Sequence, residues 1–265
     1  MIVQTAQQTY VDKWDAIDPN RLFRLPGRRK TADHFGYLLR HYWIPDEQLT
    51  YKRTIQQRRH SQDMPRGFSE TIIQTMMRCD ADRCCWREKS ERSGGMRSGF
   101  VGFYPAPALE HVLTYNRSEQ ALRQQSVDTL GSWPVDRESA QVQAFLRQPI
   151  LTPLLPIPLG FQWHVHCEAG YVDLMLTSKI PIEDMLVLIV RRRGKFRLDR
   201  FYHDDEEISR PIIVHREGIT AYSLDRSLVL YDKAKDTLES DIPDFHGYEI
   251  ETMLNLTNAE LLPPL

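Results

Sequence analysis

The chain lacks any long uninterrupted run of apolar residues. None of its stretches reaches the roughly 18 apolar residues that a membrane-spanning helix needs, so no membrane segment is expected. The N-terminal stretch MIVQTAQQTYVDKWD has neither a basic region nor the cleavable apolar segment of a secretory signal peptide. The sequence therefore predicts a soluble protein with a cytoplasmic location and no membrane partner.

Cysteine is also scarce, with 4 residues in 265. Cys79, Cys84, Cys85 and Cys167 are too few and too unevenly spaced for a disulfide framework. The first three do not form a CxxC pair, and no second paired cluster follows at zinc-finger spacing. We therefore expect reduced thiols and no metal, with a metal held by these cysteines and His60 as the less favoured alternative.

Net charge is equally small, because 34 Lys and Arg stand against 36 Asp and Glu, a formal charge of −2. Such a chain has no global electrostatic attraction to nucleic acid. Basic clusters occur at Arg53–Arg66 and Arg191–Arg197, but no aromatic residue after Tyr51 lies within the first to stack on a base. Nucleic acid is not expected as a partner, and nucleic-acid binding is the weakest functional hypothesis.

What the chain does contain is an apolar segment with the period of a β-strand. Between Leu159 and Val165, apolar residues alternate with small or polar ones, so that one face of an extended chain is apolar. Gly170 supplies a turn, and Tyr171–Ser178 forms a return strand. The segment predicts a β-hairpin around which the rest of the chain is organised.

Several other segments have the apolar spacing of short helices: Phe68–Arg78, Pro107–Leu122 and Leu230–Leu238. An apolar share of 41% is enough for one substantial core. These features predict one α/β (α+β) domain over residues 1–265, with a mixed, mainly antiparallel sheet packed against helices. Residues 1–66 form a less certain N-terminal extension of that domain.

The hairpin and its flanks resemble the thymidylate synthase superfamily, which includes the nucleotide hydroxymethylases. Phe161-Gln162 is similar to a Phe-Gln pair of that family, and Glu168–Gly170 is similar to the turn that follows. Ser227–Tyr231 resembles the family's Ser-Leu-His-x-Tyr segment, and Tyr248–Ile250 its C-terminal Glu-Ile strand. The resemblance covers residues 105–255 and rests on order and spacing. It implies a thymidylate-synthase-like fold.

The resemblance also implies a binding site for a pyrimidine nucleotide, most simply a monophosphate. Gln162 would face the base, Ser178 would bond a phosphate or base oxygen, and Tyr231 would hold a ribose hydroxyl. Arg92 and Arg137 would supply charge for the phosphate. Each of these residues has a purely structural alternative, in sheet hydrogen bonding, core packing or surface solvation. The family further implies a homodimer and allows a folate cofactor.

The family's nucleophile is missing. Ile157 stands in place of the cysteine whose thiolate adds to the pyrimidine ring, and an aliphatic side chain cannot make that bond. His164 and His166 point the same way from a strand. With Asp184 they are the remaining candidates for catalytic acid or base groups. Solvent-facing histidines are the alternative.

Two main hypotheses follow from this pattern. The first is a diverged one-carbon transferase that binds and modifies a pyrimidine nucleotide without the usual cysteine. The second is a non-catalytic homologue that acts as a dimerising or nucleotide-sensing partner. The second is favoured by the loss of the family's arginine, aspartate and histidine, replaced here by Thr177, Ile180 and Val229. These residues leave open whether the protein is an enzyme.

Overall fold

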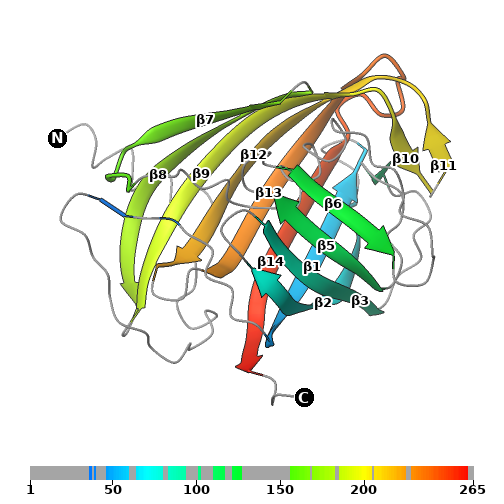
Figure 1. Ribbon diagram of the computed structural model, residues 1–265. Coiled ribbons are helices and arrows are strands. Elements are labelled where there is room, and N and C mark those ends of the chain that lie inside the picture. Colours follow the sequence, from blue (N-terminus) through cyan, green and yellow to red (C-terminus); the bar gives the residue numbers. More distant parts are fainter. Residues whose placement is uncertain are drawn as a thin grey trace.

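The computed structural model contains only β-structure and turns in the part of the chain that it describes. No helix occurs among these residues (Figure 1), and so none of them belongs to a helix long and apolar enough to cross a membrane. The predicted α/β class is therefore wrong. The structure describes residues 36–37, 39, 46–59, 64–79, 83–93, 101–102, 110–116, 121–126, 156–167, 169–182, 185–204, 206–224 and 228–261.

The described strands form two antiparallel sheets, one large and one small. The strands of the large sheet are β1 (Glu47–Arg58), β2 (Arg66–Cys79), β3 (Arg83–Ser93), β5 (Glu110–Asn116), β6 (Ala121–Ser126), β7 (Gln162–Cys167), β8 (Gly170–Ile182), β9 (Met185–Leu198), β12 (Ile212–Ser223), β13 (Leu228–Ser240) and β14 (Glu249–Leu261). Those of the small sheet are β4 (Val101–Gly102), β10 (Phe201–His203) and β11 (Glu206–Ile208).

The large sheet is eleven-stranded, with the order β6-β5-β3-β2-β1-β14-β13-β12-β9-β8-β7. Most neighbours are consecutive in the chain, as in a series of hairpins, but β1 pairs with β14. Figure 1 shows that the sheet is twisted and strongly curved. Since β1 lies within residues 1–66, that part of the chain contributes a strand to the middle of the sheet. The single-domain boundary at 1–265 stays a prediction.

Alternation along β9 defines the two faces of the sheet. Leu188, Val190, Phe196 and Leu198 are buried on one side, which we call the inner face. Arg193, Lys195 and Arg197 are exposed on the other side, the outer face. The basic cluster at positions 191–197 is thus the second half of a strand, with Arg192 on the inner face and the other charges on the outer face.

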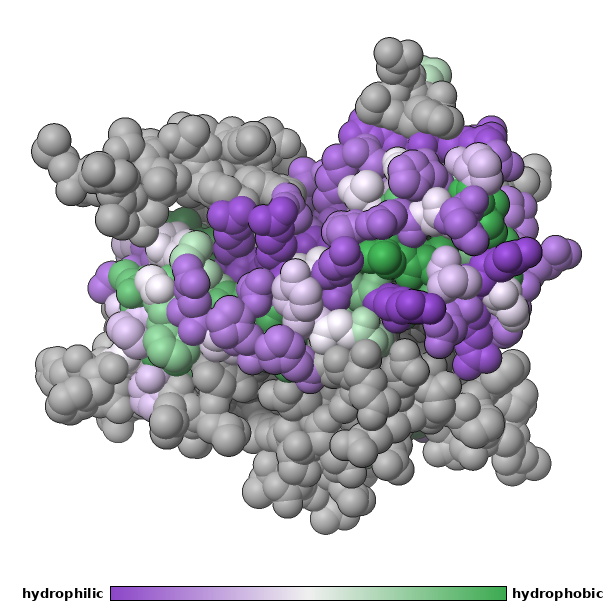
Figure 2. Space-filling model, turned by 90° about the horizontal axis from the view of Figure 1, so that it is seen from above, coloured by the Kyte–Doolittle hydropathy of each residue, from purple (hydrophilic) through white to green (hydrophobic). Residues whose placement is uncertain are grey.

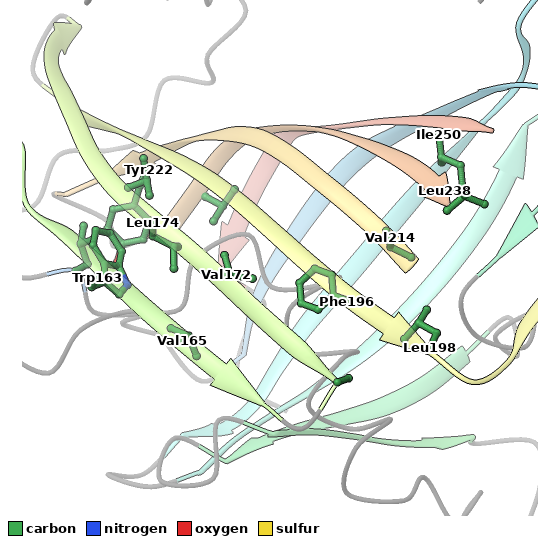
Figure 3. Close-up of a cluster of buried hydrophobic side chains, with 14 of the residues drawn as sticks. Trp163, Val165, Val172, Leu174, Phe196, Leu198, Val214, Tyr222, Leu238 and Ile250 are labelled. Carbon is green, nitrogen blue, oxygen red and sulfur yellow. The ribbon is translucent and has the colours of Figure 1, made fainter. Parts of the chain in front are cut away.

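The inner face carries the larger apolar cluster, built from β7, β8, β9, β12, β13 and β14. Figure 3 shows side chains of these strands gathered on one side of the curved sheet. Leu39 and Ile157 also belong to this cluster, and the backbones of Tyr37 and Ile157 exchange hydrogen bonds of 2.8 and 2.9 Å. The labelled members are Trp163, Val165, Val172, Leu174, Phe196, Leu198, Val214, Tyr222, Leu238 and Ile250.

A second apolar cluster joins the strands from both ends of the chain. It unites β1, β2, β3 and β14 with the beginning of β9 and parts of β12 and β13. The two clusters supply the apolar core, which the predicted fold would have formed between the sheet and packed helices. The second cluster contains Leu49, Tyr51, Ile72, Met76, Trp86, Met185, Val187, Ile189, Ala221, Leu228, Leu230 and Leu256.

The predicted hairpin is confirmed as β7 and β8. The two strands pair in register from Gln162 opposite Met175 to Cys167 opposite Gly170. Trp163 is buried and its neighbours along the strand are exposed, as a period of two requires. Gly170 is needed for close packing, because a Cβ atom there would lie 2.0 Å from the carbonyl oxygen of Lys195 on β9.

The three predicted helical segments are strands instead. Phe68–Arg78 lies within β2, Pro107–Leu122 contributes to β5 and β6, and Leu230–Leu238 lies within β13. β2 contains several β-branched residues, which fit a pleated surface between two partner strands. Pairing with β1 and β3 decided the conformation of this segment against its helical apolar spacing.

The error in β13 has a specific cause. Its inward positions include Asp232 and Asp236, which are buried. Asp236 is paired with Arg216, directly opposite on β12, and Asp232 with Arg192 on β9, the strand beyond β12, so a carboxylate can occupy a core position. Because polar residues stand where a strand pattern calls for apolar ones, the period of two is hidden in the sequence.

Candidate functional site

Two buried ion pairs cross the inner face. Arg216 donates two parallel hydrogen bonds to Asp236, each 2.6 Å long. Arg192 donates to Asp232 at 2.5 Å, and Asp232 also accepts a 2.7 Å hydrogen bond from the hydroxyl of Thr220. Burial lowers the pKa of the Arg192 guanidinium, although Asp232 opposes that change. These charges are committed to partners within the sheet and have a structural role.

A pocket of about 660 Å³ lies at one end of the large sheet, and we call it the end pocket. The end of β1 and the start of β2 meet the β13–β14 turn and β10 there. Its volume falls within the range of small-molecule sites, about 300–1,000 Å³. Seen from above, this end of the molecule shows apolar patches among hydrophilic residues (Figure 2). The described lining consists of Gln57, Arg58, Arg59, Met64, Pro65, Arg66, His203, Asp244, Phe245 and Tyr248.

One wall of the end pocket is aromatic. The ring of Phe245 lies 4.8 Å from that of Phe201 and 5.2 Å from the imidazole of His203, both edge to face. The ring of Tyr248 lies 6.4 Å from Phe245. Phe245 and Tyr248 also belong to the inner-face cluster, so the pocket wall is continuous with the apolar core.

Gln57 holds the small sheet against this site. Its side-chain amide donates to the carbonyl oxygen of Val101 and accepts from the Val101 N–H, both at 2.8 Å. The hydroxyl of Tyr248 donates to the same Gln57 oxygen at 3.2 Å. Val101 lies on β4, opposite His203 of β10. The Gln57 side chain thus pairs with the Val101 backbone as a strand would, and this contact positions β4 and β10, with His203, at the pocket.

The part of the end pocket formed by the end of β1 and the start of β2 is basic. Arg58 is paired with Glu249, and Arg59 is paired with Asp244. Arg66, which lies opposite Gln57 in the β1–β2 register, is exposed and forms no ion pair within the described part of the chain. Burial raises the pKa of Glu249, but hydrogen bonds from Lys235 and Arg58 outweigh it and leave the pKa below its usual value.

The pKa of the Tyr248 hydroxyl is influenced by two of these arginines. Burial raises its pKa, the nearby Arg66 and Arg59 oppose the rise, and Asp204 adds to it. The hydroxyl therefore stays protonated at neutral pH and remains a donor to Gln57. Arg59 and Arg66 line the same pocket as Phe245 and Tyr248.

The end pocket can bind a ligand through apolar contact with its aromatic residues and through hydrogen bonds donated by its arginines. Its described lining includes no serine, threonine or cysteine that could serve as a nucleophile. Across all described residues, no three His, Cys, Asp or Glu side chains are grouped to hold a metal ion.

The site residues expected on β7 are exposed on the outer face. Gln162 donates a 3.3 Å hydrogen bond to the sulfur of Met175. His164 lies 2.5 Å from a carboxylate oxygen of Asp173 on β8. The ring of His166 lies 6.1 Å from that of Tyr171. These contacts are cross-strand pairs of an edge hairpin, and none of the three expected residues lines the end pocket.

The other expected residues are dispersed. Ser178 and Tyr231 share one register row through Ile189 and Ala221. Three strand spacings of about 4.8 Å separate them, roughly 14 Å along the sheet. The backbone of Arg92 lies on β3 opposite Glu70. Arg137 and Asp184 lie outside the described residues, and a ligand role for any member of this set stays a prediction.

The end pocket itself was not found from the sequence. Its β1–β2 residues were part of a basic cluster, with Arg58, Arg59 and Arg66 flanking Met64-Pro65. That arrangement of arginines around apolar residues is a weak signal. The aromatic wall is far away in the chain, since Gln57 and Tyr248 are 191 positions apart, and only the pairing of β1 with β14 unites them.

Comparison with known proteins gives only weak similarities to solved structures. No family model matches the chain, and no curated protein matches it. A DUF1329 family protein from Desulfovibrio piger is 9% identical, with 83% of this chain and 88% of that chain covered and a TM-score of 0.24. A LolA superfamily protein from Nitrosomonas europaea is 8% identical, with 84% and 89% covered and a TM-score of 0.26. A putative outer membrane lipoprotein-sorting protein domain from Vibrio parahaemolyticus is 7% identical, with 83% and 86% covered and a TM-score of 0.23. Similarity this low carries no argument about function.

The resemblance to the thymidylate synthase superfamily is wrong. It implied a sheet packed against helices, whereas the described chain is all β, and segment 230–238, aligned with a helix, is part of β13. The transferase and the nucleotide-sensing partner are withdrawn with it, together with the pyrimidine nucleotide and the homodimer. The cytoplasmic location, which was expected from the lack of a long apolar run and of a signal segment, is withdrawn too; one of the structures above is described as a putative outer membrane lipoprotein-sorting protein domain. Nucleic-acid binding loses its basis, because Arg53 is paired with Glu70 and Arg192 with Asp232.

Proposed function

We propose that this protein is a binding protein that takes one small amphipathic molecule, without covalent attachment, into the end pocket. The observation that supports this is the division of the pocket into an aromatic wall, continuous with the core, and a basic side. Phe245 and Tyr248 offer apolar surface, and Met64, 91% exposed, extends that surface at the rim. Sites that combine apolar walls with a few polar groups bind and orient small ligands.

The expected affinity is moderate. An alkyl chain that buries six methylene groups gains about 5 kcal/mol at roughly 0.8 kcal/mol per group. Part of this is offset by the lost freedom of the bound molecule, and polar contacts at the other end add to it. Dissociation constants between about 1 μM and 1 mM are therefore expected for alkyl ligands.

The test is a fluorescence titration with the neutral probe N-phenyl-1-naphthylamine, followed by its displacement with dodecanol. Two exposed methionines give a matched pair of variants. Met64→Gln changes the pocket rim, whereas Met77→Gln changes a methionine on β2, 48% exposed, that does not line the pocket. We expect Met64→Gln to weaken probe binding several-fold and Met77→Gln to leave it unchanged.

Absence of saturable probe binding by the wild-type protein would reject the proposal. Equal loss in both methionine variants would place the binding elsewhere. As a second readout, a dodecanol analogue with a photoreactive diazirine should label peptides that contain residues 57–66 and 244–248. Labelling confined to β7 and β8 would contradict the end pocket as the site.

A further inference from the structure

We propose that the amphipathic ligand carries an anionic head group and that Arg66 binds its oxygen atoms. This inference rests on the proposed function of the end pocket and adds the chemical class of the ligand. The shared chemistry is an anionic oxygen group, a carboxylate or a phosphate, on an apolar chain.

The three arginines of the end pocket differ in their partners. Arg58 is engaged by Glu249, and Arg59 is engaged by Asp244. Arg66 lies at the same pocket and has no carboxylate partner within the described residues. A guanidinium presents a planar fork of donors that fits two oxygens of a carboxylate or phosphate. Arg66 is therefore the arginine that can bind an incoming anion without first breaking an ion pair.

The position of Arg66 suits a ligand with one polar end. It begins β2 directly opposite Gln57, which contacts Tyr248. It also acts electrostatically on the Tyr248 hydroxyl, as the pKa of that group reflects. An anion on Arg66 would consequently leave the rest of the molecule facing the aromatic wall of Phe245 and Tyr248.

The charges of the pocket lining also favour an anionic head group. Three arginines stand against one aspartate, Asp244, in the described lining, and Arg58 has a further carboxylate partner in Glu249. A cationic head group would meet like charges close by, whereas an anionic one would be attracted at the same distance. A neutral head group would gain only ordinary hydrogen bonds, which are about half as strong as charge-assisted ones.

The experiment compares twelve-carbon ligands that differ only in the head: dodecanoate, dodecyl phosphate, dodecanol and dodecyltrimethylammonium. Each displaces the neutral probe from the full-length protein, below its micelle concentration, and inorganic phosphate is added as a chain-free anion. The variants are Arg66→Gln and, as a matched control, Arg193→Gln on the outer face, where the arginine side chain is 70% exposed.

We expect at least one of the two anionic ligands to bind wild-type protein about tenfold or more tightly than dodecanol. Arg66→Gln should remove most of that preference and weaken dodecanol binding much less than anion binding, while Arg193→Gln should keep the preference. The preference should also shrink at high salt, because the head-group contact lies at the surface.

Equal binding of anionic and neutral ligands by the wild type, or an anion preference that survives in Arg66→Gln, would overturn the head-group assignment while the proposed function stands. Tighter binding of the ammonium ligand would do the same. If inorganic phosphate competes as well as dodecyl phosphate, the site takes a free anion, and the amphipathic head-group assignment fails. If even dodecanol and the neutral probe do not bind, the proposed function itself has failed.

Discussion

Arginine–aspartate pairs occur in two regions of this molecule, on the inner face and at the end pocket, and burial gives them different roles. In the buried pair, the side chains of Arg216 and Asp236 are 6% and 1% exposed; in the pocket pair, those of Arg59 and Asp244 are 50% and 65% exposed. The buried charges have lost their hydration and depend on each other. The exposed ones remain hydrated and contribute little to stability. The same chemistry therefore holds β12 to β13 in one region and makes only a weak, solvent-exposed contact in the other.

The largest effect should come from breaking the buried pair. Asp236→Ala leaves the Arg216 guanidinium buried without its carboxylate, and we expect it to lower the free energy of unfolding by about 3–5 kcal/mol. Chemical denaturation of the variant and the wild type measures this difference. The double variant Arg216→Met, Asp236→Leu should recover most of the loss, since no unpaired charge remains. A loss below about 1 kcal/mol in Asp236→Ala would show that the pair is not buried in solution.

A somewhat smaller effect is expected at the junction between core and pocket. Gln57→Leu removes both hydrogen bonds to the Val101 backbone and leaves that buried N–H and C=O without their partner. We expect a destabilisation of about 2–4 kcal/mol, measured by chemical denaturation. Gln56→Leu, at the exposed neighbouring position on β1, is the control and should change stability by less than about 0.5 kcal/mol. Similar values for the two variants would contradict the role of Gln57.

A pH titration tests the burial of Tyr51 in the second apolar cluster, away from both regions. Burial, and then the charges of Glu47 and Glu88, raise the pKa of Tyr51. Its hydroxyl therefore keeps its proton in the folded state at a pH where the unfolded chain, with a tyrosine pKa of about 10, has lost it. The stability from this residue is complete below pH 10 and is lost as the pH rises toward the folded pKa, with a slope of up to about 1.4 kcal/mol per pH unit. Denaturation between pH 9 and 11 should show a shallower decline for Tyr51→Phe than for the wild type, and identical slopes would contradict the assignment.

The smallest effect should come from the exposed pair. Arg59→Ala removes an ion pair that is half in solvent, so we expect the free energy of unfolding to change by less than about 0.5 kcal/mol. The measurement is the denaturation experiment used for Asp236→Ala. A loss of 2 kcal/mol or more would mean that the pocket arginines are structural, and it would remove the contrast between the two regions.

The sequence predicted correctly those parts of the fold whose apolar alternation is visible within one short segment. The β7–β8 hairpin was found because Trp163 and Val165 alternate with exposed residues and Gly170 lies at the turn, where β8 begins. β13 was mistaken for a helix because Asp232 and Asp236 occupy inward positions. The partners that make this tolerable, Arg192 and Arg216, are on other strands. The sequence of β13 itself therefore gives no indication of these partner arginines.

For the end pocket, too, local sequence patterns and contacts between strands determined different things. The sequence by itself determined the alternation of the hairpin and the absence of a metal-type cysteine spacing, because both depend on residues close together in the chain. Only the tertiary structure decided which arginines are buried in pairs and which line a pocket. Only the pairing of β1 with β14 brought Gln57 to Tyr248 across 191 positions. The physical reason is that burial and electrostatic pairing belong to contacts between strands, and a single strand does not contain its own neighbours.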